Sequence, residues 1–365
     1  MSNSVGGTGT ATHGQVRTLL FLSINDGTDT RINKEIATLS QAFVIDFVGI
    51  SAEGGRPFFS DKVRRVELIE GRRRSPTSLL RMGWRIFRLR SRNHYDTIHV
   101  IDEKLLLLFW PLLLGPRVVL DLFDSTFLKT SWPRSLTWLA QRISYALPKR
   151  VIVTDEDRAG LMPDFVRPKL VVLPNYPRRF SGSRSVRDPA VVRVLYCGTL
   201  LARRGTEFIE QLLDVAEDVR VVMAGWIRDE RTQALVKHPQ VEWLGVVNQQ
   251  QIIQQATRCD FILCHYEPKN LNNIYASPNK IYDAIQAGAA VIINPEVQVA
   301  RFVREHGLGV ILDSFMPADM SAVAQALRIF KTAYRPDPAL REKYLWEAVE
   351  DRLLAAHGVR SGDKV

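Results

Sequence analysis

The chain has 365 residues, of which 46% are hydrophobic, and it carries a formal net charge of +10 at pH 7. A chain of this length exceeds what one hydrophobic core usually serves, so two globular domains are expected. Its three cysteines have no CxxC spacing, which argues against a disulfide framework and a zinc site and fits a reducing cytoplasm.

The first half of the chain has the alternating pattern of a parallel sheet with helical crossovers. Residues 1–15 are small and polar, and they are expected to form a disordered tail and not a signal peptide. Strand-like and helix-like segments then alternate from residue 16 to residue 175. The expected strands are 16–24, 43–50, 96–101, 117–123, 150–154 and 169–175, and the expected helices are 30–41, 134–147 and an apolar, buried helix at 105–116.

A second alternating set follows a break in the pattern. Residues 176–190 are rich in Pro, Ser, Gly and Arg and are expected to be a linker. From 191 to 340 the expected strands are 192–198, 219–225, 241–245, 260–266 and 289–293, with helices at 205–217, 248–258 and 278–287. The sequence thus predicts an α/β protein with two Rossmann-like, doubly wound domains facing across a cleft, where such sheets bind ligands.

The helix expected at 278–287 carries charge where burial would be costly. Ser277 is predicted to be its N-cap, Pro278 its first residue and Gly288 its stop. Lys280 and Asp283, three residues apart, share one face of its first turns. They form either a solvated ion pair or a binding site, and the adjacent helix start favours the second interpretation.

Several segments, in order along the chain, resemble the retaining, family 4-like glycosyltransferases of the GT-B fold. "YCGTLLARRGTEFIEQLL" at 196–213 is similar to the loop after the first strand of their second domain, and "SPNKIYDAIQAGAAVI" is similar to their donor-binding helix. The resemblance runs from Val16 to Leu354 and includes "YDTIHVID", "VVLDLFDS", "VIVTDEDRAGL", "VVLPN" and the closing "YLWEAVEDRLL". It implies that the last segment, 341–365, forms a helix that packs back on the N-terminal domain.

The resemblance implies a hexosyltransferase that uses neither metal nor cofactor and retains the anomeric configuration. Its donor would be a nucleotide-diphosphate sugar, with a UDP-sugar favoured over GDP-mannose. The helix start would bind the diphosphate, Lys280 and Arg204 would supply countercharge, and Asp283 would accept hydrogen bonds from the ribose. The expected donor-binding residues are Gly198, Thr199, Arg204, Asn273, Ser277, Asn279, Lys280 and Asp283.

The sequence departs from the family pattern at three positions. Thr199 stands where the family has Arg after the glycine that corresponds to Gly198, and Arg204 stands where Lys is common. Tyr275 replaces a Glu eight residues before the ribose-binding acid. Lys280 is therefore expected to take over phosphate binding, and Asn272, Asn273 or Glu267 is expected to contact the sugar.

Polar residues at strand ends of the first half are candidates for the acceptor side. Asp26, Gly27 and Arg31 follow the first strand, and Asp121 and Asp124 lie at the end of the fourth, although turn and capping chemistry would explain them equally well. Asp124 is expected near the reacting hydroxyl, as general base if the enzyme inverts, and with Arg204 and Lys280 it forms the expected catalytic set.

Two further motifs are given structural interpretations. The DxD spacing in "TDEDR" at 154–158 is attributed to a helix start capped by Thr154, so no metal site is predicted. His99 is expected to pack near a strand end.

Positive charge is concentrated in residues 56–92, which hold 12 basic and three acidic residues. Within 75–92, Arg81, Arg85, Arg88 and Arg92 form one helical stripe, and Leu79, Met82, Ile86 and Leu89 form another. A solvated surface helix and a helix docked on anionic lipid are both compatible with this pattern. Docking on anionic lipid would make the protein a cytoplasmic, peripheral membrane enzyme that binds the inner face of the plasma membrane through the Arg-rich segment 64–92.

The functional hypothesis is transfer of a sugar to a lipid-linked glycan in surface polysaccharide assembly. A nucleotide-sugar epimerase of the same fold is one alternative, and a nucleic-acid-binding protein is another. The second half of the chain is nearly neutral, and the sequence has no RRM, KH or zinc-finger pattern, so no nucleic-acid partner is expected.

Overall fold

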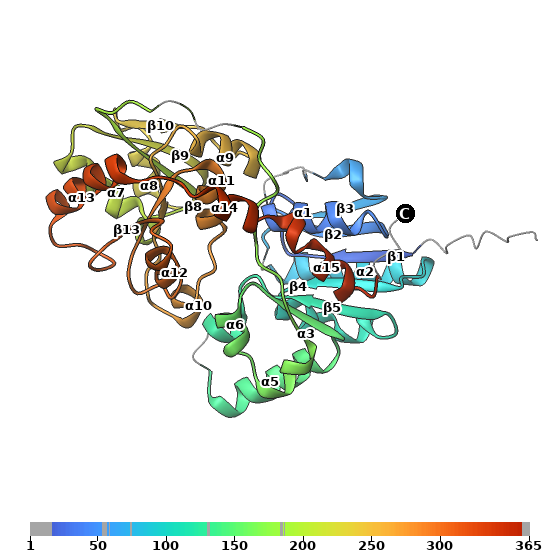
Figure 1. The fold of residues 1–365 in the computed structure, drawn as a ribbon. Coiled ribbons are helices and arrows are strands. Elements are labelled where there is room, and N and C mark those ends of the chain that lie inside the picture. Colours follow the sequence, from blue (N-terminus) through green and yellow to red (C-terminus); the bar gives the residue numbers. More distant parts are fainter. Residues whose placement is uncertain are drawn as a thin grey trace, which may run out of the picture.

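The N-terminal domain contains a seven-stranded parallel sheet in the order β3-β2-β1-β4-β5-β6-β7 (Figure 1). The structure is a computed structural model that describes residues 17–52, 57, 59–73, 75–129, 132–182, 185 and 187–359, so the expected tail at 1–15 lies outside the described residues. The strands are β1 (Thr18–Leu22), β2 (Val44–Ser51), β3 (Arg65–Glu70), β4 (Thr97–Ile101), β5 (Arg117–Asp121), β6 (Arg150–Val153) and β7 (Leu170–Val172).

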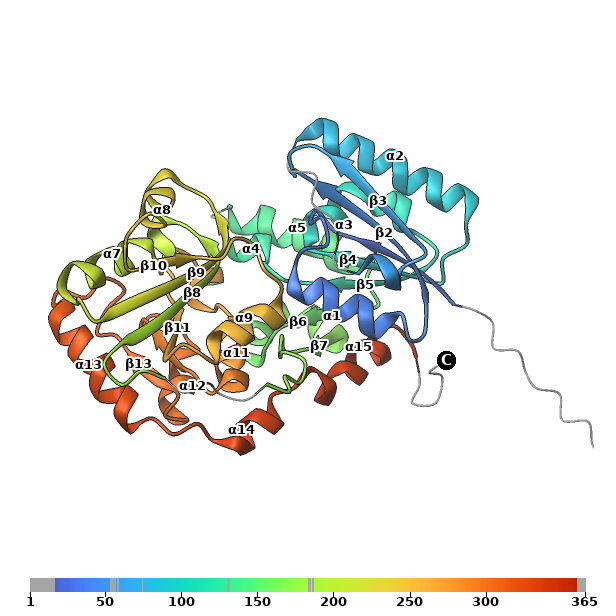
Figure 2. The same cartoon turned by 90° about the horizontal axis from the view of Figure 1, so that it is seen from above.

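Helices cover both faces of this sheet. Figure 2 shows α2 on one side and α1 with α15 on the other. α1 (Thr30–Leu39) and α15 (Glu350–Ala356) share one hydrophobic core, while α2 (Pro76–Arg92), α3 (Glu103–Phe109) and α5 (Arg134–Ala146) share the other. The shorter elements are α4 (Thr126–Lys129), α6 (Glu156–Gly160) and the 3-10 turns η1 (Ser60–Lys62), η2 (Trp110–Leu113) and η3 (Asp164–Lys169).

The C-terminal domain contains six parallel strands in the order β10-β9-β8-β11-β12-β13. The strands are β8 (Val192–Leu200), β9 (Val219–Ile227), β10 (Val241–Trp243), β11 (Phe261–Cys264), β12 (Ala290–Ile293) and β13 (Gly309–Ile311). The helices are α7 (Thr206–Val215), α8 (Glu230–Leu235), α9 (Gln249–Ala256), α10 (Leu271–Ile274), α11 (Asn279–Ala287), α12 (Ala300–Glu305) and α13 (Met320–Ala333), with the turn η4 (Ala202–Arg204) after β8.

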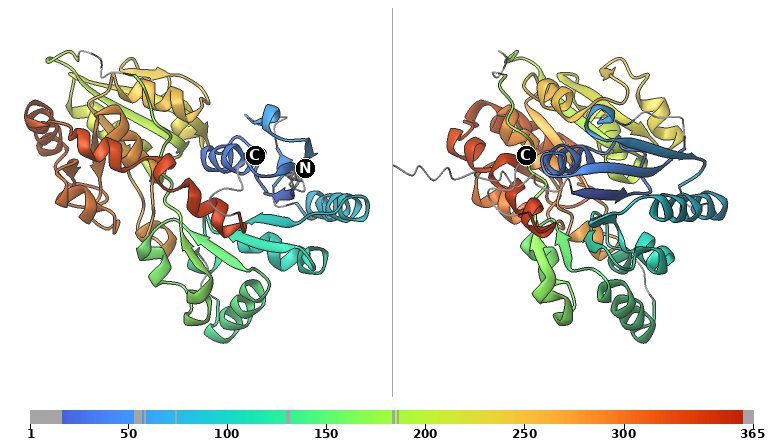
Figure 3. Two further views of the ribbon diagram at one scale, coloured as in Figure 1. Left: turned by 45° about the vertical axis from the view of Figure 1, so that its right-hand side comes forward. Right: turned by 90° about the vertical axis from the view of Figure 1, so that its right-hand side faces the viewer.

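The chain passes between the domains twice. The first passage is the linker between β7 and β8, whose described residues form neither helix nor strand. The second runs through α14 (Pro338–Lys343) and η5 (Trp346–Ala348) to α15, and Figure 3 shows this segment in red crossing to the N-terminal domain. Trp346 is fully buried there, and its Nε1 donates to the Thr38 hydroxyl of α1 at 2.8 Å.

The two facing α/β domains predicted from the sequence are confirmed, with local differences that include the unexpected strand β13 and helices α12 and α13 of the C-terminal domain. Strand β3 was not expected, because its outward residues are charged and it forms the edge of the sheet. The buried helix expected at 105–116 is also wrong: α3 ends at Phe109 and a 3-10 turn follows, since Pro111 lacks the N–H that would continue the α-helix. Trp110 in this turn is 47% exposed. Among the described residues there is no helix with the length and hydrophobicity needed to cross a membrane.

Candidate active site

Helix α11 begins at Asn279 with no side-chain cap. The expectation that Ser277 is the N-cap is wrong, because Pro278 has the extended backbone of the capping position and no side chain accepts from the first turn. Gly288 ends the helix in the left-handed conformation with φ 66°, as predicted. The first backbone N–H groups of α11 therefore have no capping side chain and are available to an anion.

Two cationic side chains flank Tyr266 beside this helix start. The Lys280 ammonium lies 5.9 Å and the Arg204 guanidinium 4.8 Å from the centre of the Tyr266 ring. The only hydrogen bond described for Lys280 Nζ is a 3.3 Å contact with the carbonyl of Leu263, and Arg204 Nε is buried without a hydrogen-bond partner in the described structure. Burial opposes the charge of Lys280, yet its surroundings raise its pKa. Two cations with unused donors can supply countercharge and hydrogen bonds to an anion.

Gly198 allows the backbone to approach this pair of cations. It has a φ of 96°, which side-chain-bearing residues rarely adopt, and a Cβ at this position would lie 3.7 Å from Lys280 Cε. Thr199 follows it in β8, half-buried, opposite Trp226 of β9. The expected donor residues Gly198, Arg204 and Lys280 are therefore brought together at the carboxyl end of the sheet.

Asp283 lies one turn into α11 and faces the N-terminal domain. Its side chain is 2% exposed and accepts hydrogen bonds from Gln249 Nε2 at 2.8 Å and Asn279 Nδ2 at 3.4 Å. Burial raises the pKa of Asp283 to about 7, and the strongest opposing influence is Lys34 of α1. Burial likewise lowers the pKa of Lys34 to about 7, with Asp283 as the main opposing charge. Sequence reasoning missed Lys34, since only the domain arrangement brings it to this site.

The other residues expected to contact the donor or its sugar differ in their surroundings. Asn273 Nδ2 donates to the carbonyl of Glu267 at 2.8 Å, and the Glu267 carboxylate is held by Arg203 and Lys269 at 3.1 and 3.2 Å. Ser277 instead lines a separate cavity of about 240 Å³ with Tyr282. The structure thus places Ser277 away from the two cations.

Asp124 stands at the opposite wall of the cleft, close to the donor side. Its Oδ1 accepts from Asn272 Nδ2 at 3.1 Å and its Oδ2 accepts from Lys129 Nζ at 2.8 Å. Desolvation in the cleft would raise the pKa of Asp124, but these two partners and Arg158 outweigh it and lower the pKa. Asp124 is therefore ionised at neutral pH, as an acceptor of a hydroxyl proton must be.

Asp26 lines a cavity of about 250 Å³ between the two domains. Its Oδ2 pairs with Arg73 at 3.4 Å, and Trp226 and Arg228 from the end of β9 complete the wall with Ala52. Gly27 is buried instead, with a φ of 88°, and a Cβ there would lie 2.7 Å from the Phe59 ring. Gly27 thus shapes the loop and offers no surface to an acceptor. Sequence reasoning missed Trp226, Arg73 and Arg228 as neighbours of Asp26.

Arg31 lies in the interior and not at the cleft. It is 2% exposed and pairs with Glu35 Oε1 at 2.8 Å and Asp121 Oδ2 at 2.9 Å, while its Nη1 donates to the carbonyl of Leu173. The expected acceptor contact through Arg31 is therefore corrected to a structural role. The charge pattern could not reveal this, because both carboxylates lie on elements that only the fold brings together.

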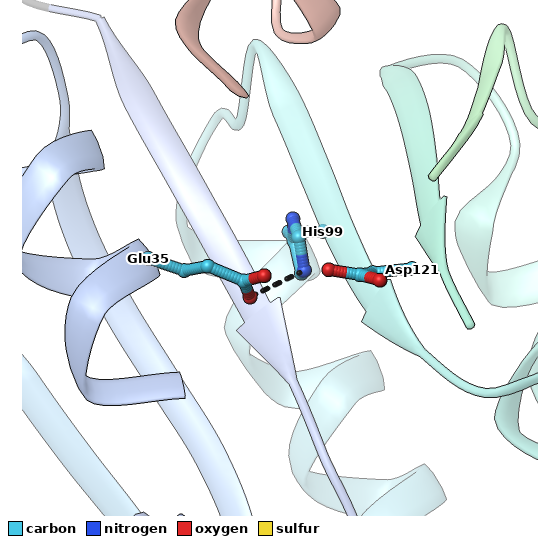
Figure 4. A group of neighbouring side chains, drawn as sticks. All are labelled: Glu35, His99 and Asp121. Atoms are coloured by element: carbon cyan, nitrogen blue, oxygen red, sulfur yellow. Dashed lines mark ion pairs between the residues drawn. The ribbon is translucent and has the colours of Figure 1, made fainter. Parts of the chain in front are cut away.

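Glu35, His99 and Asp121 form a buried cluster whose ligand-type atoms lie within 4.8 Å of one another (Figure 4). His99 Nε2 lies 3.5 Å from Glu35 Oε2, and both atoms lack a hydrogen-bond partner in the described structure. Burial and the nearby Asp121 raise the pKa of Glu35 well above its usual range. Arg31 contacts both carboxylates and supplies the positive charge that a cation would bring, so we interpret the cluster as structural.

Asp102 is the strongest candidate that sequence reasoning missed. It follows β4 with φ 63° and ψ 151°, and it is the one non-glycine among the described residues with a positive φ. Its carboxylate accepts from the backbone N–H groups of Phe123 and Asp124, both at 3.2 Å. Burial, then Glu103 and Asp124, raise the pKa of Asp102 to about 8. Backbone strain of this kind is concentrated at functional sites.

The segment 154–158 starts a helix, but the capping residue differs from the prediction. Asp155, and not Thr154, is the N-cap of α6, because its Oδ1 accepts from the backbone N–H of Arg158 at 2.7 Å. The Arg158 side chain then crosses to the C-terminal domain and donates to the carbonyl of Tyr275 at 2.8 Å. One acid of the DxD spacing is thereby occupied as a cap.

Two facing Rossmann-like domains with this site between them define the GT-B fold of glycosyltransferases, as the resemblance predicted. HepE of Anabaena, solved in complex with UDP and glucose, is 13% identical over 94% of this chain and 99% of its own, with a TM-score of 0.68. Sucrose-phosphate synthase from Thermosynechococcus elongatus is 14% identical over 93% of this chain and 95% of its own, with a TM-score of 0.65.

WaaG, a glycosyltransferase involved in lipopolysaccharide biosynthesis, is 12% identical over 94% of this chain and 96% of its own, with a TM-score of 0.59. A scan against models of protein families and a search of curated proteins gave no match. At these identities the likeness establishes the fold.

Proposed function

We propose that this chain is a glycosyltransferase that transfers a sugar from a nucleotide-diphosphate sugar to an acceptor hydroxyl, with a UDP-sugar as the favoured donor. The observation that carries the proposal is the pair Arg204 and Lys280, which hold unused hydrogen-bond donors beside the uncapped start of α11. A diphosphate matches this site in charge and in acceptor geometry. The fold shared with HepE, which was solved with UDP-glucose, supports a donor of that class.

Asp283 would hold the ribose by accepting hydrogen bonds from its hydroxyls, which would replace the hydrogen bond that Gln249 now donates. The base would then occupy the cavity of about 410 Å³ that Asn248 and Gln249 line opposite Lys34. Arg204 and Lys280 would neutralise the leaving diphosphate, which requires no metal and is the main source of rate acceleration in this scheme.

Asp124 would orient the acceptor hydroxyl on the other wall of the cleft. We propose retention of the anomeric configuration, because the leaving phosphate can then take the hydroxyl proton while Arg204 and Lys280 hold it in place. The cavity beside Asp26 would bind the acceptor, and Arg73 and Arg228 in its wall suit an acceptor that carries a phosphate group. A polyprenyl-diphosphate glycan, as used in surface polysaccharide assembly at the cytoplasmic face of the membrane, has this chemistry.

Calorimetry with UDP, GDP and their glucose and mannose conjugates tests the donor site. The Lys280→Ala variant should bind the preferred nucleotide about 10- to 100-fold more weakly, the size expected for a lost charge-assisted hydrogen bond. Lys237→Ala, an exposed lysine of the same domain, is the matched control and should leave affinity unchanged. Equal affinity of the wild-type protein and Lys280→Ala would place the phosphates elsewhere.

Product analysis separates the proposal from an epimerase of the same fold. Incubation with UDP-glucose alone should release no isomeric nucleotide sugar, and addition of an acceptor should release UDP. Formation of an epimer in the absence of acceptor would support the alternative enzyme.

A further inference from the structure

Helix α2 is apolar on two sides. Met82, Ile86 and Leu89 are buried against the sheet, as the predicted stripe requires, but Leu80, Trp84 and Phe87 on the other side are 74%, 54% and 58% exposed. These three positions also follow helical spacing, so they form a second, continuous stripe. A helix that is hydrophobic on both sides has one face without a partner in this chain.

Helix α5 is covered even less. Only Ser144 and Tyr145 of this 13-residue helix are buried, and Leu136, Trp138 and Leu139 are 56%, 54% and 51% exposed. An apolar groove of about 340 Å³ runs between α5 and Leu107 of α3. This much exposed aromatic and aliphatic surface is costly in water and indicates an interaction surface.

The two helices belong to one face of the N-terminal domain, which we call the helical face: α2, α3, η2 and α5. The guanidinium of Arg90 in α2 donates to the carbonyls of Leu112 and Leu114 at the end of η2. Tyr145 of α5 donates to Glu103 of α3 at 3.0 Å. All four elements pack on one hydrophobic core, and α2, α3 and α5 lie on the same side of the sheet in Figure 2, so their outward side chains face the same side of the domain.

The charged residues of α2 and α5 are all basic, and the acid Glu103 of α3 is buried. Residues 76–92 contain five arginines and no acid, and residues 125–154 contain five lysines or arginines and no acid. The Arg85 and Arg88 guanidinia lie 5.4 and 5.3 Å from the Trp84 ring, so cations are interleaved with the exposed apolar residues. Arginine beside tryptophan suits the boundary between anionic headgroups and acyl chains. A partner that binds this face is therefore expected to be negatively charged.

The helical face also adjoins the cleft. Asp124 precedes α4 (Thr126–Lys129), and the Phe127 ring of that helix packs 6.4 Å from Trp132 at the rim of the apolar groove. The apolar groove of the helical face therefore lies close to Asp124, the residue expected near the reacting hydroxyl.

We propose that the helical face docks on an anionic lipid bilayer, with Trp84, Phe87 and Trp138 entering the acyl boundary and the surrounding arginines contacting lipid phosphates. This inference rests on the proposed function, because docking there would bring a lipid-linked acceptor to the cleft. The proposed docking surface includes α5 in addition to the Arg-rich segment 64–92 expected from the sequence. Within that segment Arg64 is engaged internally, paired with Asp46 at 2.6 Å.

Cosedimentation with phosphatidylcholine vesicles, with and without phosphatidylglycerol, tests the proposal on the full-length chain. The wild-type protein should bind the anionic vesicles and lose binding as salt is raised. Trp84→Ser combined with Phe87→Ser should weaken partitioning about tenfold through lost apolar burial. Arg81→Gln and Arg92→Gln should each weaken it about fivefold. Ile329→Ser, an equally exposed apolar position on α13, is the matched control and should have no effect.

Three results would overturn the docking surface. One is vesicle binding that ignores phosphatidylglycerol and salt, and another is a double variant that binds as the wild-type protein does. The third is a dimer in solution without lipid that Trp138→Ser converts to a monomer, since the face would then join two copies of this chain.

The docking assay needs no nucleotide, so it can fail separately from the proposed function. A protein that binds UDP but ignores vesicles contradicts the docking surface alone. A protein that binds vesicles but no nucleotide contradicts the enzymatic proposal instead.

Discussion

Asp124 of the N-terminal domain and Asn272 of the C-terminal domain are joined by a hydrogen bond of 3.1 Å across the cleft. Arg158 joins the same two walls, since its guanidinium donates to the carbonyls of Phe123 and Tyr275. The floor of the cleft is therefore held together by groups from both domains. Asp124 lies there with Lys129 on its other oxygen, ionised and oriented before any substrate binds.

Asp124→Asn should lower kcat by about 100-fold, the lower end of the effect of a positioned acid–base group, because the amide cannot accept the hydroxyl proton or orient the hydroxyl in the same way. Affinity for UDP should change much less than kcat, since the hydrogen bonds described for the Asp124 side chain go to Asn272 and Lys129 and not to Arg204 or Lys280. Steady-state kinetics with calorimetry separate the two quantities. Wild-type kcat in this variant would remove Asp124 from the reaction.

Nucleotide affinity should depend on pH through Asp283. The folded protein without nucleotide raises the pKa of this carboxyl to about 7, and ribose hydroxyls donate to its ionised form. Affinity for UDP should therefore fall as pH is lowered below about 7 and level off above it. Asp283→Asn should bind more weakly at alkaline pH and lose this dependence. A wild-type profile that is flat between pH about 5.5 and 8 would contradict the assignment.

Asp102 should make the folded protein less stable as pH rises. Its folded pKa of about 8 lies above the ordinary value of 3.8, so the stability that its proton contributes is fully present below about 3.8 and is lost as pH rises toward about 8. Asp102→Asn cannot ionise and should lose less unfolding free energy over this range. Urea unfolding at several pH values measures the difference, and parallel curves for both proteins would refute the prediction.

The sequence allowed prediction of what depends on local pattern. The presence of α11, its stop at Gly288 and the pair Lys280 and Asp283 follow from residues within one short segment, although the capping residue was predicted one position too early. Parallel strands could be placed because buried strands are continuous apolar runs. The predicted helix stripe of α2 was correct for Met82 and Ile86.

Long-range arrangement could not be read from the sequence. Lys34 reaches Asp283 only because the domains face each other, and Arg31 was misplaced because its partner Asp121 is 90 residues away. Asp102 was missed because its backbone strain has no composition signal. The exposed stripe of Trp84 and Phe87 was missed because apolar residues on a helix were assumed to face a single core.

The C-terminal helix is anchored by a buried histidine pair. His357 Nδ1 donates to the carbonyl of Leu353, so its Nε2 accepts from His99 Nδ1 at 3.0 Å. His357→Ala should lower the free energy of unfolding by about 1 to 3 kcal/mol, through the lost hydrogen bond and the unpaired His99 nitrogen. Thermal or urea unfolding measures this loss, with His306→Ala, an exposed histidine, as the control.

The same pair should respond to acid. Burial lowers the pKa of His357 to about 4, below the ordinary 6.5, so the unfolded chain takes up the proton first as pH falls. The wild-type protein should thus lose stability between pH about 6.5 and 4, and His357→Gln should lose less. An identical acid slope in both proteins would exclude His357 as its source.

The double passage of the chain between the domains restricts how the cleft can open. The linker after β7 and the segment through Trp346 are the two chain connections between the domains. Trp346 ties the linker to the N-terminal domain, since its backbone N–H donates to the carbonyl of Pro177 at 2.8 Å and its indole N–H donates to Thr38 of α1. Two connections between the same two domains favour relative rotation about the line that joins them. Opening by rotation about that line would keep the Asp124 wall opposite the Lys280 wall, and we expect the domains to return to the same alignment after product release.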